Sequence, residues 1–380
     1  MTTMMQACTY NSHNARPTIT TQKIPLPNTS NGQLLVKIHA AAINPIDHVT
    51  HKGTHYFLFN FKWPRTFGFD FAGVVETTDD KKTFKKGDRV FGQIAGLPQY
   101  GTGTVANYII INVKYCVKIP NNLSFVEASA MPLVSITAFN ALKLCGLQTS
   151  RDNNNKNDNL RVLITGGSGG VGSQAIQIAK NIFHASFIAT TASSGKKTIL
   201  CKELGADKVI DYKNENFEIV LTKDPWNDKF FDAIIDCTGE AWKCIHLLKK
   251  GGGMCSITTG PTIEAMRIWL NGAGSSPHDG APTMAFGIQS FIENGCGGSL
   301  VNYFAGGNGL QNACKKQGAS FHHLIGAPEE NGVLNEIANY LQEEKLKPVI
   351  DKIFPFNEAV EAIAYQKAGR CAGKVVIQVL

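Results

Sequence analysis

The chain has 380 residues, of which 43% are hydrophobic and 18% are charged. These values are typical of a globular protein with ample core, and the length is enough for two domains. The net charge of +7 is spread along the chain without long Lys/Arg runs, which argues against nucleic acid as the main partner. Because no apolar run reaches membrane length and no secretory h-region is present, we expect a cytoplasmic protein without a membrane span.

Ten cysteines are scattered along the chain, and no two of them form Cys-x-x-Cys. Several lie in apolar runs, such as Cys237 in AIIDC and Cys255 in MCSI. This pattern favours reduced, buried thiols over a disulfide framework.

The N-terminal third is predicted to be mostly β structure. Short strand-like runs separated by turns are typical of a barrel-like β domain, and they cover residues 33–41, 68–76, 88–92, 105–111 and 115–119. Residues 42–64 lack clear periodicity, so we expect a loop with a helical turn there.

A helical region follows. Ser124 and Glu127 match a capping box. Pro132 is expected to break the helix, and a second helix should begin near Val134. The polar tract at 151–159 is predicted to be a solvated low-complexity loop.

The middle of the chain carries a glycine-rich turn between a strand and a helix. Residues 160–165 are an apolar run, and apolar residues recur at helical spacing after the turn. The turn fits G-x-G-x-x-G, in which the first glycine permits tight turning, the second lets a pyrophosphate approach and the third allows close helix packing. The helix start would face the phosphates. The residues predicted to bind a dinucleotide here are Gly167, Gly169, Gly170, Val171 and Gly172.

After this turn the chain alternates between strands and helices, which predicts an α/β domain with a parallel doubly wound sheet. Strands are expected at 185–190, 209–212, 231–237, 254–258 and 319–325. The long Gly- and Asn-rich insertion at 260–318 contains two possible helices, at 263–270 and 286–293, and we expect a lid or substrate wall. Two helices, at 334–344 and 356–366, and a strand at 374–380 close the chain.

Several motifs together resemble one family: AAINPID ending at Asp47, FGFDFAGVVE (67–76), KKGDRVFG (85–92), LGADKVIDY (204–212) and GKVVIQVL (373–380). The chain resembles the medium-chain dehydrogenase/reductase superfamily, and within it the zinc-independent quinone oxidoreductase (zeta-crystallin-like) group. It is most similar to mitochondrial reticulon-interacting oxidoreductases and plant enone reductases. The resemblance implies a GroES-like β-barrel catalytic domain at 1–133 and 328–380, and a Rossmann NADPH-binding domain at 134–327.

No metal site is predicted. Zinc members of the superfamily carry Gly-His-Glu where this chain has Gly68-Phe69-Asp70, and Asn44 and Asp47 stand where a ligand cysteine is expected. The cofactor is predicted to be NADPH, because the end of the second Rossmann strand lacks the acid that holds a ribose 2′-OH. Hydroxyls and lysines stand there instead, and the resemblance places Lys197 and Tyr212 at the 2′-phosphate. The residues predicted for this phosphate are Ser193, Ser194, Lys197 and Tyr212.

The resemblance also implies roles for other residues. Thr137 is expected near the nicotinamide, and Cys237, Thr238 and Gly239 where the backbone passes the cofactor. Gly260 follows the fifth strand beside the nicotinamide, and Lys374 or Arg370 reaches the cofactor unless it is a plain surface cation. Asn44 is the candidate donor to the developing negative oxygen, and Asp47 orients its loop. Tyr56 is either a candidate acid or a cleft-lining aromatic, and solvent is the alternative proton source.

The predicted reaction is hydride transfer from NADPH to a quinone. Two alternatives stay open: reduction of α,β-unsaturated carbonyls (enones or alkenals), and a non-catalytic NADPH-binding protein. The family suggests a homodimer through the strand at 319–325, and a monomer stays open because the long preceding segment could cover that edge. The mitochondrial relatives keep a mitochondrial location open as the alternative to the cytoplasm.

Overall fold

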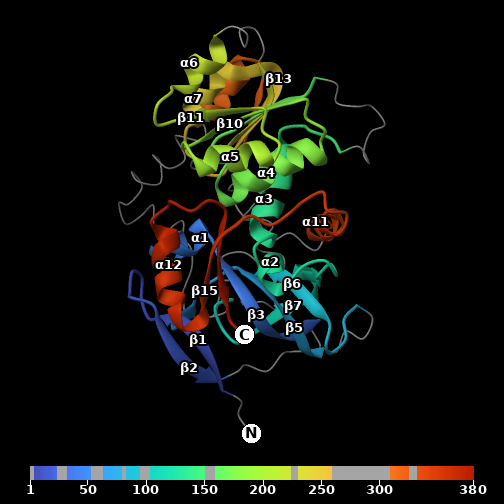
Figure 1. Cartoon of the computed structure of the whole chain (residues 1–380), viewed down its shortest axis with the longest axis vertical. Helices are drawn as coiled ribbons and strands as arrows, with labels where there is room; N and C mark the ends of the chain where they lie inside the picture. Colours follow the sequence, from blue (N-terminus) through green and yellow to red (C-terminus); the bar gives the residue numbers. More distant parts are fainter. Residues whose placement is uncertain are drawn as a thin grey trace, which may run out of the picture. The chain divides into compact units, whose positions relative to one another are not determined.

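The computed structural model describes residues 4–23, 32–52, 63–78, 83–94, 103–149, 159–223, 230–258, 309–324 and 332–380. These residues form two compact units. The first contains the described residues up to Ile136 and those from 332 onward, and the second contains those from Thr137 to 324. Strands from both ends of the sequence, such as β3 and β15, lie in the first unit (Figure 1).

The first unit contains two sheets. The smaller sheet has the order β2 (Thr18–Lys23), β1 (Met4–Tyr10), β4 (Arg65–Thr66). The larger sheet has the order β15 (Ile350–Pro355), β16 (Lys374–Gln378), β3 (Gln33–Ile43), β5 (Asp70–Thr78), β6 (Arg89–Gln93), β8 (Cys116–Lys118), and β7 (Tyr108–Asn112) also pairs with β3. Strand β3 alternates buried and half-buried residues, so its apolar face, with Val36 and Ile38, packs into the core. The predicted β-rich N-terminal third is confirmed.

The helices of the first unit partly differ from the predictions. Where a loop with a helical turn was expected, α1 (Pro45–Lys52) is a helix of eight residues. The capping box of α2 (Phe125–Ser129) is confirmed, since Ser124 Oγ accepts from Glu127 N at 3.2 Å and Glu127 Oε2 accepts from Ser124 N at 2.9 Å. The predicted break at Pro132 is confirmed, because α2 ends at Ser129 and α3 (Pro132–Leu144) begins at the proline, two residues before the expected start near Val134. The backbone N–H of the first helical residue has no acceptor within the helix, so proline, which lacks this N–H, is well suited to that position.

Two more helices among the described residues belong to the first unit. These are α11 (Gly332–Gln342) and α12 (Ala359–Lys367), the latter preceded by the 3₁₀ turn η5 (Phe356–Glu358). Another such turn, η3 (Val113–Tyr115), precedes β8. The predicted helices at 334–344 and 356–366 are therefore confirmed.

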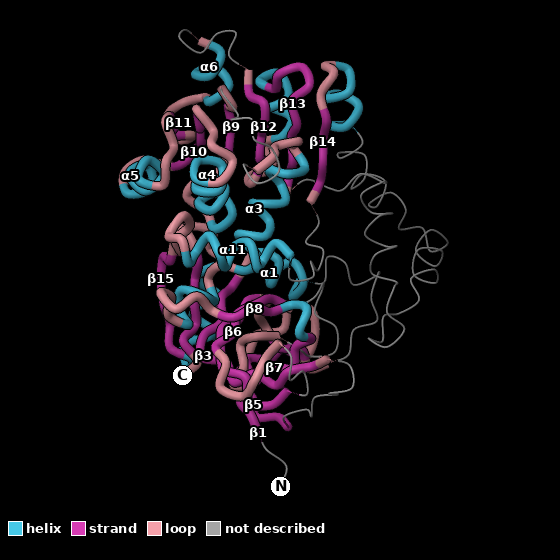
Figure 2. The backbone as a smooth tube through the Cα atoms, turned by 90° about the vertical axis from the view of Figure 1, so that its right-hand side faces the viewer, coloured by secondary structure: helices cyan, strands magenta, loops and turns pink. Residues whose placement is uncertain are grey.

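The second unit is built on a six-stranded parallel sheet (Figure 2). Its order is β11 (Lys208–Asp211), β10 (Phe187–Ala192), β9 (Arg161–Ile164), β12 (Phe231–Asp236), β13 (Leu248–Ser256), β14 (Ser320–His323). The chain moves outward from β9 to β11 and then outward in the other direction from β12 to β14. This reversal beside β9 is the place where such sheets bind ligands, outside the carboxyl ends of the strands. The predicted Rossmann-type sheet is confirmed.

Its described helices include α4 (Gly170–Asn181), α5 (Lys196–Glu203), α6 (Phe217–Thr222) and α7 (Ala241–Cys244), with the 3₁₀ turn η4 (Ile245–Leu247), and residues 309–316 are helical as well. One strand start was predicted wrongly: β13 begins at Leu248 instead of Met254 and runs through three glycines. The glycine run resembles a turn in sequence. However, a Cβ on Gly253 would lie 2.5 Å from Cys145 Cα, so glycine there permits close packing. The helices predicted at 263–270 and 286–293, and the polar tract at 151–158, lie outside the described residues.

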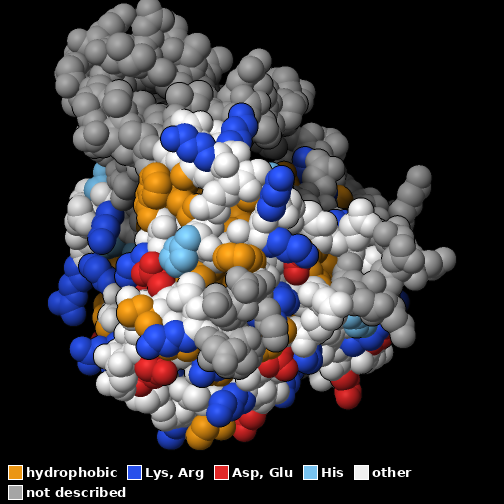
Figure 3. Space-filling view, turned by 90° about the horizontal axis from the view of Figure 1, so that it is seen from above, with side chains coloured by type: hydrophobic (Ala, Val, Ile, Leu, Met, Phe, Trp, Pro, Cys, Tyr) orange, Lys and Arg blue, Asp and Glu red, His pale blue; other side chains and the backbone are white. Residues whose placement is uncertain are grey.

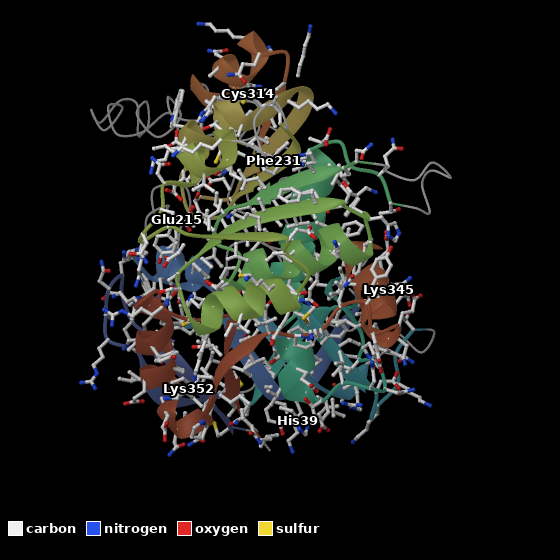
Figure 4. All side chains as sticks on the ribbon, turned by 45° about the horizontal axis from the view of Figure 1, so that its top comes forward. His39, Glu215, Phe231, Cys314, Lys345 and Lys352 are labelled. Carbon is white, nitrogen blue, oxygen red and sulfur yellow. The ribbon has the colours of Figure 1, made fainter. Side chains whose placement is uncertain are left out.

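Apolar side chains fill both units. Phe231, labelled in Figure 4, is 1% exposed and belongs to the core of the second unit. All nine described cysteines are free and seven of them are buried, which confirms the predicted reduced thiols for that part of the chain. None of the helices in the described ranges is long and apolar enough to span a bilayer.

Candidate functional site

The turn between β9 and α4 packs too closely for most of its glycines to be replaced. A Cβ on Gly172 would lie 2.2 Å from the carbonyl oxygen of Gly166. A Cβ on Gly167 would lie 2.1 Å from Thr190 Oγ1, and that hydroxyl is held by a 2.7 Å hydrogen bond to Ile164 O. The backbone N–H of Gly167 also donates to Thr191 O at 2.9 Å. The first and third glycines of the fingerprint are therefore required by the packing of this turn.

The second glycine is different. Gly169 is the N-cap of α4 with φ −78° and ψ 175°, and no side chain caps the helix. A Cβ there would meet only Gly166 O, at 3.3 Å. Gly169, Gly170 and Val171 are half-buried, whereas Gly167 and Gly172 are buried. The uncapped N–H groups and the positive end of the helix dipole can therefore receive an anion such as a pyrophosphate.

A buried carboxylate holds the neighbouring strand ends together. Asp236 has no exposed surface. Its Oδ1 accepts from Thr165 Oγ1 at 3.0 Å and from three successive backbone N–H groups, those of residues 238–240, at 3.0–3.2 Å. Its Oδ2 accepts from Ser256 Oγ at 2.8 Å. Asp236 thus ties the carboxyl ends of β9, β12 and β13, and it fixes the turn that contains the predicted residues Thr238 and Gly239.

Of the other predicted residues, Cys237 and Gly239 belong to the turn that Asp236 fixes. Cys237 N donates to Thr165 Oγ1 at 2.9 Å. Gly239 has φ +85°, a value that favours glycine. Thr137 is half-buried on α3. Gly260 lies outside the described residues, so its expected place beside the nicotinamide stays a prediction.

The predicted 2′-phosphate residues follow β10 and β11. Ser193 and Ser194 follow β10, Lys197 lies in the first turn of α5, and Tyr212 follows β11 with 54% of its surface exposed. The structure also brings in an acid that sequence analysis missed. Asp211 pairs in register with Ala192 and accepts hydrogen bonds from Ser194. The carboxyl ends of neighbouring parallel strands share one edge, but the sheet order is needed to show that β11 is the neighbour of β10.

A second polar cluster lies inside the first unit, where Asn44, Asp47, Asp70 and Lys374 meet. Their exposed fractions are 0%, 3%, 0% and 4%. Asn44 Nδ2 donates to Asp70 Oδ2 at 2.9 Å, and Lys374 Nζ lies 3.0 Å from the same oxygen. Lys374 Nζ also donates to Asn44 Oδ1. The cluster joins the loop before α1, the start of β5 and the start of β16.

Asp47 organises the loop that leads into α1. Its Oδ2 accepts from Asn44 N at 2.7 Å and its Oδ1 from Gly68 N at 2.9 Å. Burial raises the pKa of Asp47 to about 7, against the lowering effects of the Asn44 N–H bond and of the Lys374 charge. The expected loop-orienting role of Asp47 fits these contacts. Tyr56 lies outside the described residues, so its role as an acid stays a prediction.

The side chains of Asn44 and Lys374 are placed differently from what their expected roles require. The Asn44 amide is fully buried and engaged with Asp70 and Lys374, so it is better placed to hold its loop than to touch a substrate oxygen. The Lys374 amine is likewise engaged inside the first unit. Its expected contact with the cofactor stays a prediction, as does that of Arg370, whose side chain is exposed.

The fold agrees with comparisons to known proteins. Residues 30–121 match the family described as alcohol dehydrogenase GroES-like domain, and residues 204–377 match the family described as zinc-binding dehydrogenase. The chain belongs to the medium-chain dehydrogenase/reductase superfamily. It is an oxidoreductase of the NAD(P)H-dependent quinone and enone reductase type.

Among its relatives, the 2-methylene-furan-3-one reductase of Solanum lycopersicum is 31% identical, over 93% of this chain and 74% of that protein. The mitochondrial NAD(P)H oxidoreductase RTN4IP1 of Bos taurus is 30% identical, over 94% and 84%. The solved quinone oxidoreductase from Coxiella burnetii superposes with a TM-score of 0.73 at 27% identity and covers 100% of both chains. The resemblance inferred from the motifs is therefore confirmed.

One matched family is named for zinc, and the residues here do not fit that metal. No three His, Cys, Asp or Glu side chains in the described parts of the chain lie together as a metal site. Phe69, which replaces the histidine of the zinc members, is a buried aromatic that cannot ligate. The Asp70 carboxylate beside it already pairs with the Lys374 ammonium. This donor set suits an internal ion pair rather than a divalent cation.

Proposed function

We propose that this protein is a zinc-independent oxidoreductase that transfers a hydride from NADPH to a quinone. The observation that supports the proposal most strongly is the presence of glycine at position 169. Its backbone angles suit any residue and a Cβ there would meet one atom, Gly166 O at 3.3 Å, so the fold alone demands glycine less here than at Gly167 or Gly172. A pyrophosphate that approaches the backbone makes that demand. When bound, the reduced nicotinamide supplies the hydride.

The preference for NADPH rests on the end of β10. Ser193, Ser194 and Lys197 can hold a 2′-phosphate, and Tyr212 lies on the adjacent loop. We propose that residues 134–327 form the NADPH-binding domain and that residues 1–133 with 328–380 form the catalytic domain. The Asp211 carboxylate beside Ser194 weakens the preference for NADPH over NADH, because its negative charge repels a 2′-phosphate.

Hydride addition to a quinone leaves a negative oxygen that must be stabilised and then protonated. We propose that Asn44 and Asp47 hold the loop before α1 for this step, and that Thr137 lies near the nicotinamide. Tyr56 supplies the proton in this proposal, with solvent as the alternative source. The overall change adds one hydride and one proton to the quinone, which gives the hydroquinone.

A second candidate function is reduction of an activated carbon–carbon double bond. Two relatives favour it by name: the 2-methylene-furan-3-one reductase of Solanum lycopersicum and the NADPH-dependent alkenal/one oxidoreductase of Arabidopsis thaliana. Here the hydride adds to the β-carbon of an enone and a proton adds to the α-carbon. The same cofactor edge and the same loop would serve both acceptors.

A third candidate is an NADPH-binding protein without turnover. The two expected contributors to the reaction, Asn44 and Thr137, argue against it. Basic side chains on the face drawn in Figure 3 are scattered among apolar and acidic ones. We therefore propose a small-molecule partner rather than nucleic acid. A homodimer through β14 and a cytoplasmic location complete the proposal, with mitochondria as the alternative compartment, as in RTN4IP1 of Bos taurus.

The test is the oxidation of NADPH and NADH with an ortho-quinone, a para-quinone and a simple enone, each with and without a chelator. Turnover with NADPH and a quinone that survives chelation supports the proposal. Faster turnover with the enone selects the second function. Tight NADPH binding without turnover of any acceptor selects the third. Loss of turnover on chelation would contradict the zinc-independent chemistry.

A further inference from the structure

The amine of Lys374 lies inside the first unit, in contact with polar groups from distant parts of the sequence. Nζ lies 3.0 Å from Asp70 Oδ2, across a separation of 304 residues, and it donates to Asn44 Oδ1. Lys374 is 4% exposed, and both partners have no exposed surface. A lysine is almost never buried to this degree without a paired carboxylate.

The backbone directs this side chain into the cluster. Strand β16 pairs antiparallel with β3, with Val375 opposite Ile43, so Lys374 begins the strand next to Asn44. Gly373, just before it, has φ +99°, and a Cβ there would lie 2.3 Å from Val349 O. The N–H of Lys374 donates to the same Val349 carbonyl at 2.8 Å. Gly373 and this bond fix the point at which the ammonium enters.

The ammonium decides which way the Asn44 amide points. Because Oδ1 accepts from Lys374 Nζ, Nδ2 faces Asp70 Oδ2 and donates to it at 2.9 Å. The other oxygen of Asp70 accepts from Leu133 N at 3.0 Å. If the amide were flipped, its oxygen would face the carboxylate and both groups would lose their partners. The backbone of Asn44 is held in turn by Asp47.

We propose that Lys374 is a fixed internal cation that neutralises Asp70 and orients Asn44, so that Asn44 and the first turn of α1, which contains Asp47, are held for hydride transfer without a metal ion. The inference rests on the proposed function. It makes Lys374 a positioning residue instead of a residue that touches the cofactor. It also explains why zinc does not fit here, since an ammonium at the Asp70 oxygen repels a second cation.

The test compares variants of the full chain. Lys374→Met removes the charge at similar length, Lys374→Arg keeps it, and Asp70→Asn with Lys374→Met removes both charges. The control is Lys352→Met, because Lys352 is exposed on β15 of the same unit (Figure 4). We expect Lys374→Met to lower kcat about 100-fold, the scale of a small misplacement in an active site. Lys374→Arg should have a kcat between those of Lys374→Met and the wild type, and the control Lys352→Met should have the kcat of the wild type.

Two further measurements separate positioning from other roles. The dissociation constant of NADPH, followed by its fluorescence, should stay within about twofold in Lys374→Met, because uniform binding is not affected. The acid limb of the kcat–pH profile should move to higher pH in Lys374→Met, since the Lys374 charge lowers the pKa of Asp47. It should move back in the double variant, because the Asp70 charge raises that pKa. A purely structural role would not produce these opposite movements.

The outcomes are distinct. If the wild-type chain reduces no acceptor, the proposed function fails and this inference fails with it. If the wild type is active and Lys374→Met keeps kcat within about twofold, only this inference is overturned. A weaker NADPH affinity with unchanged kcat would instead make Lys374 a cofactor contact and overturn the positioning role. If Lys374→Met does not fold, the double variant decides, because it leaves no unpaired buried charge: slow turnover supports the inference and normal turnover overturns it.

Discussion

Alanine at Gly169 and at Gly172 should have opposite consequences, although both glycines belong to one fingerprint. Gly172→Ala places a Cβ 2.2 Å from Gly166 O and 2.8 Å from Gly167 Cα, both of them backbone atoms. Gly169→Ala places a Cβ 3.3 Å from Gly166 O, and φ of −78° suits alanine. The first substitution should damage the fold of the turn, and the second should damage only the binding of a dinucleotide.

The distances set the magnitudes. Overpacking typically costs about 1–3 kcal/mol, and the Gly172 contact, with backbone on both sides, belongs at the upper end of that range. A loss of about 3 kcal/mol lowers the melting temperature by roughly 6–12 °C for a unit of this size. At Gly169 the neighbour has to give by only a few tenths of an ångström, so we expect a loss below about 1 kcal/mol. A methyl group in the path of a pyrophosphate should nevertheless weaken NADPH binding by about tenfold or more.

Thermal unfolding and NADPH fluorescence titration of the two variants test this difference. Gly169→Ala should melt close to the wild type and bind NADPH poorly. Gly172→Ala should melt much earlier, whatever its residual binding. Equal melting temperatures for the two variants, or normal NADPH affinity in Gly169→Ala, would refute the assignment of the second glycine to a ligand and the third to packing.

Three further predictions concern buried and edge carboxylates. Asp236→Asn replaces an acceptor oxygen by a donor, so it should lower the free energy of unfolding by about 3 kcal/mol, as measured by thermal unfolding. The same substitution should weaken NADPH binding. Asp211→Asn should raise the NADPH-to-NADH ratio of kcat/KM about threefold, since an exposed charge beside Ser194 acts weakly. For Asp47, burial raises the pKa from 3.8 to about 7, so the folded state holds its proton between these values. Stability to thermal unfolding should therefore fall as pH rises from about 4 to about 7 and then level off, and Asp47→Asn should lack this component.

Elements with a strong local pattern were predictable from the sequence. Strand β3 alternates buried and half-buried residues, and β9 is an apolar run directly before the glycine turn. Strand β15 was missed because only Phe354 is buried in it, which leaves no periodic signal. The start of β13 was missed because three consecutive glycines indicate a turn unless the neighbouring helix is known to approach them.

The candidate site likewise contains features that a local sequence pattern predicts and contacts that it does not predict. The glycine fingerprint is local, so the six residues from Gly167 to Gly172 define it. The pair of Lys374 and Asp70 joins residues 304 positions apart, so no local pattern in either segment predicts the contact between them. The contact between Asp211 and Ser194 depends on the register of two parallel strands. Predicting these contacts requires the strand order, which periodicity alone does not provide.

Each unit uses one fully buried carboxylate to fix loops that regular secondary structure does not hold. Asp236 receives the amides of residues 238–240 and hydroxyls from two other strand ends. Asp70 receives an amide, an ammonium and the backbone N–H of Leu133. Each carboxylate gathers donors from at least three chain segments, so the loops at the strand ends are anchored to the sheets. Because a hydride must be delivered at a fixed distance and angle, such anchoring supplies orientation that flexible loops would lose.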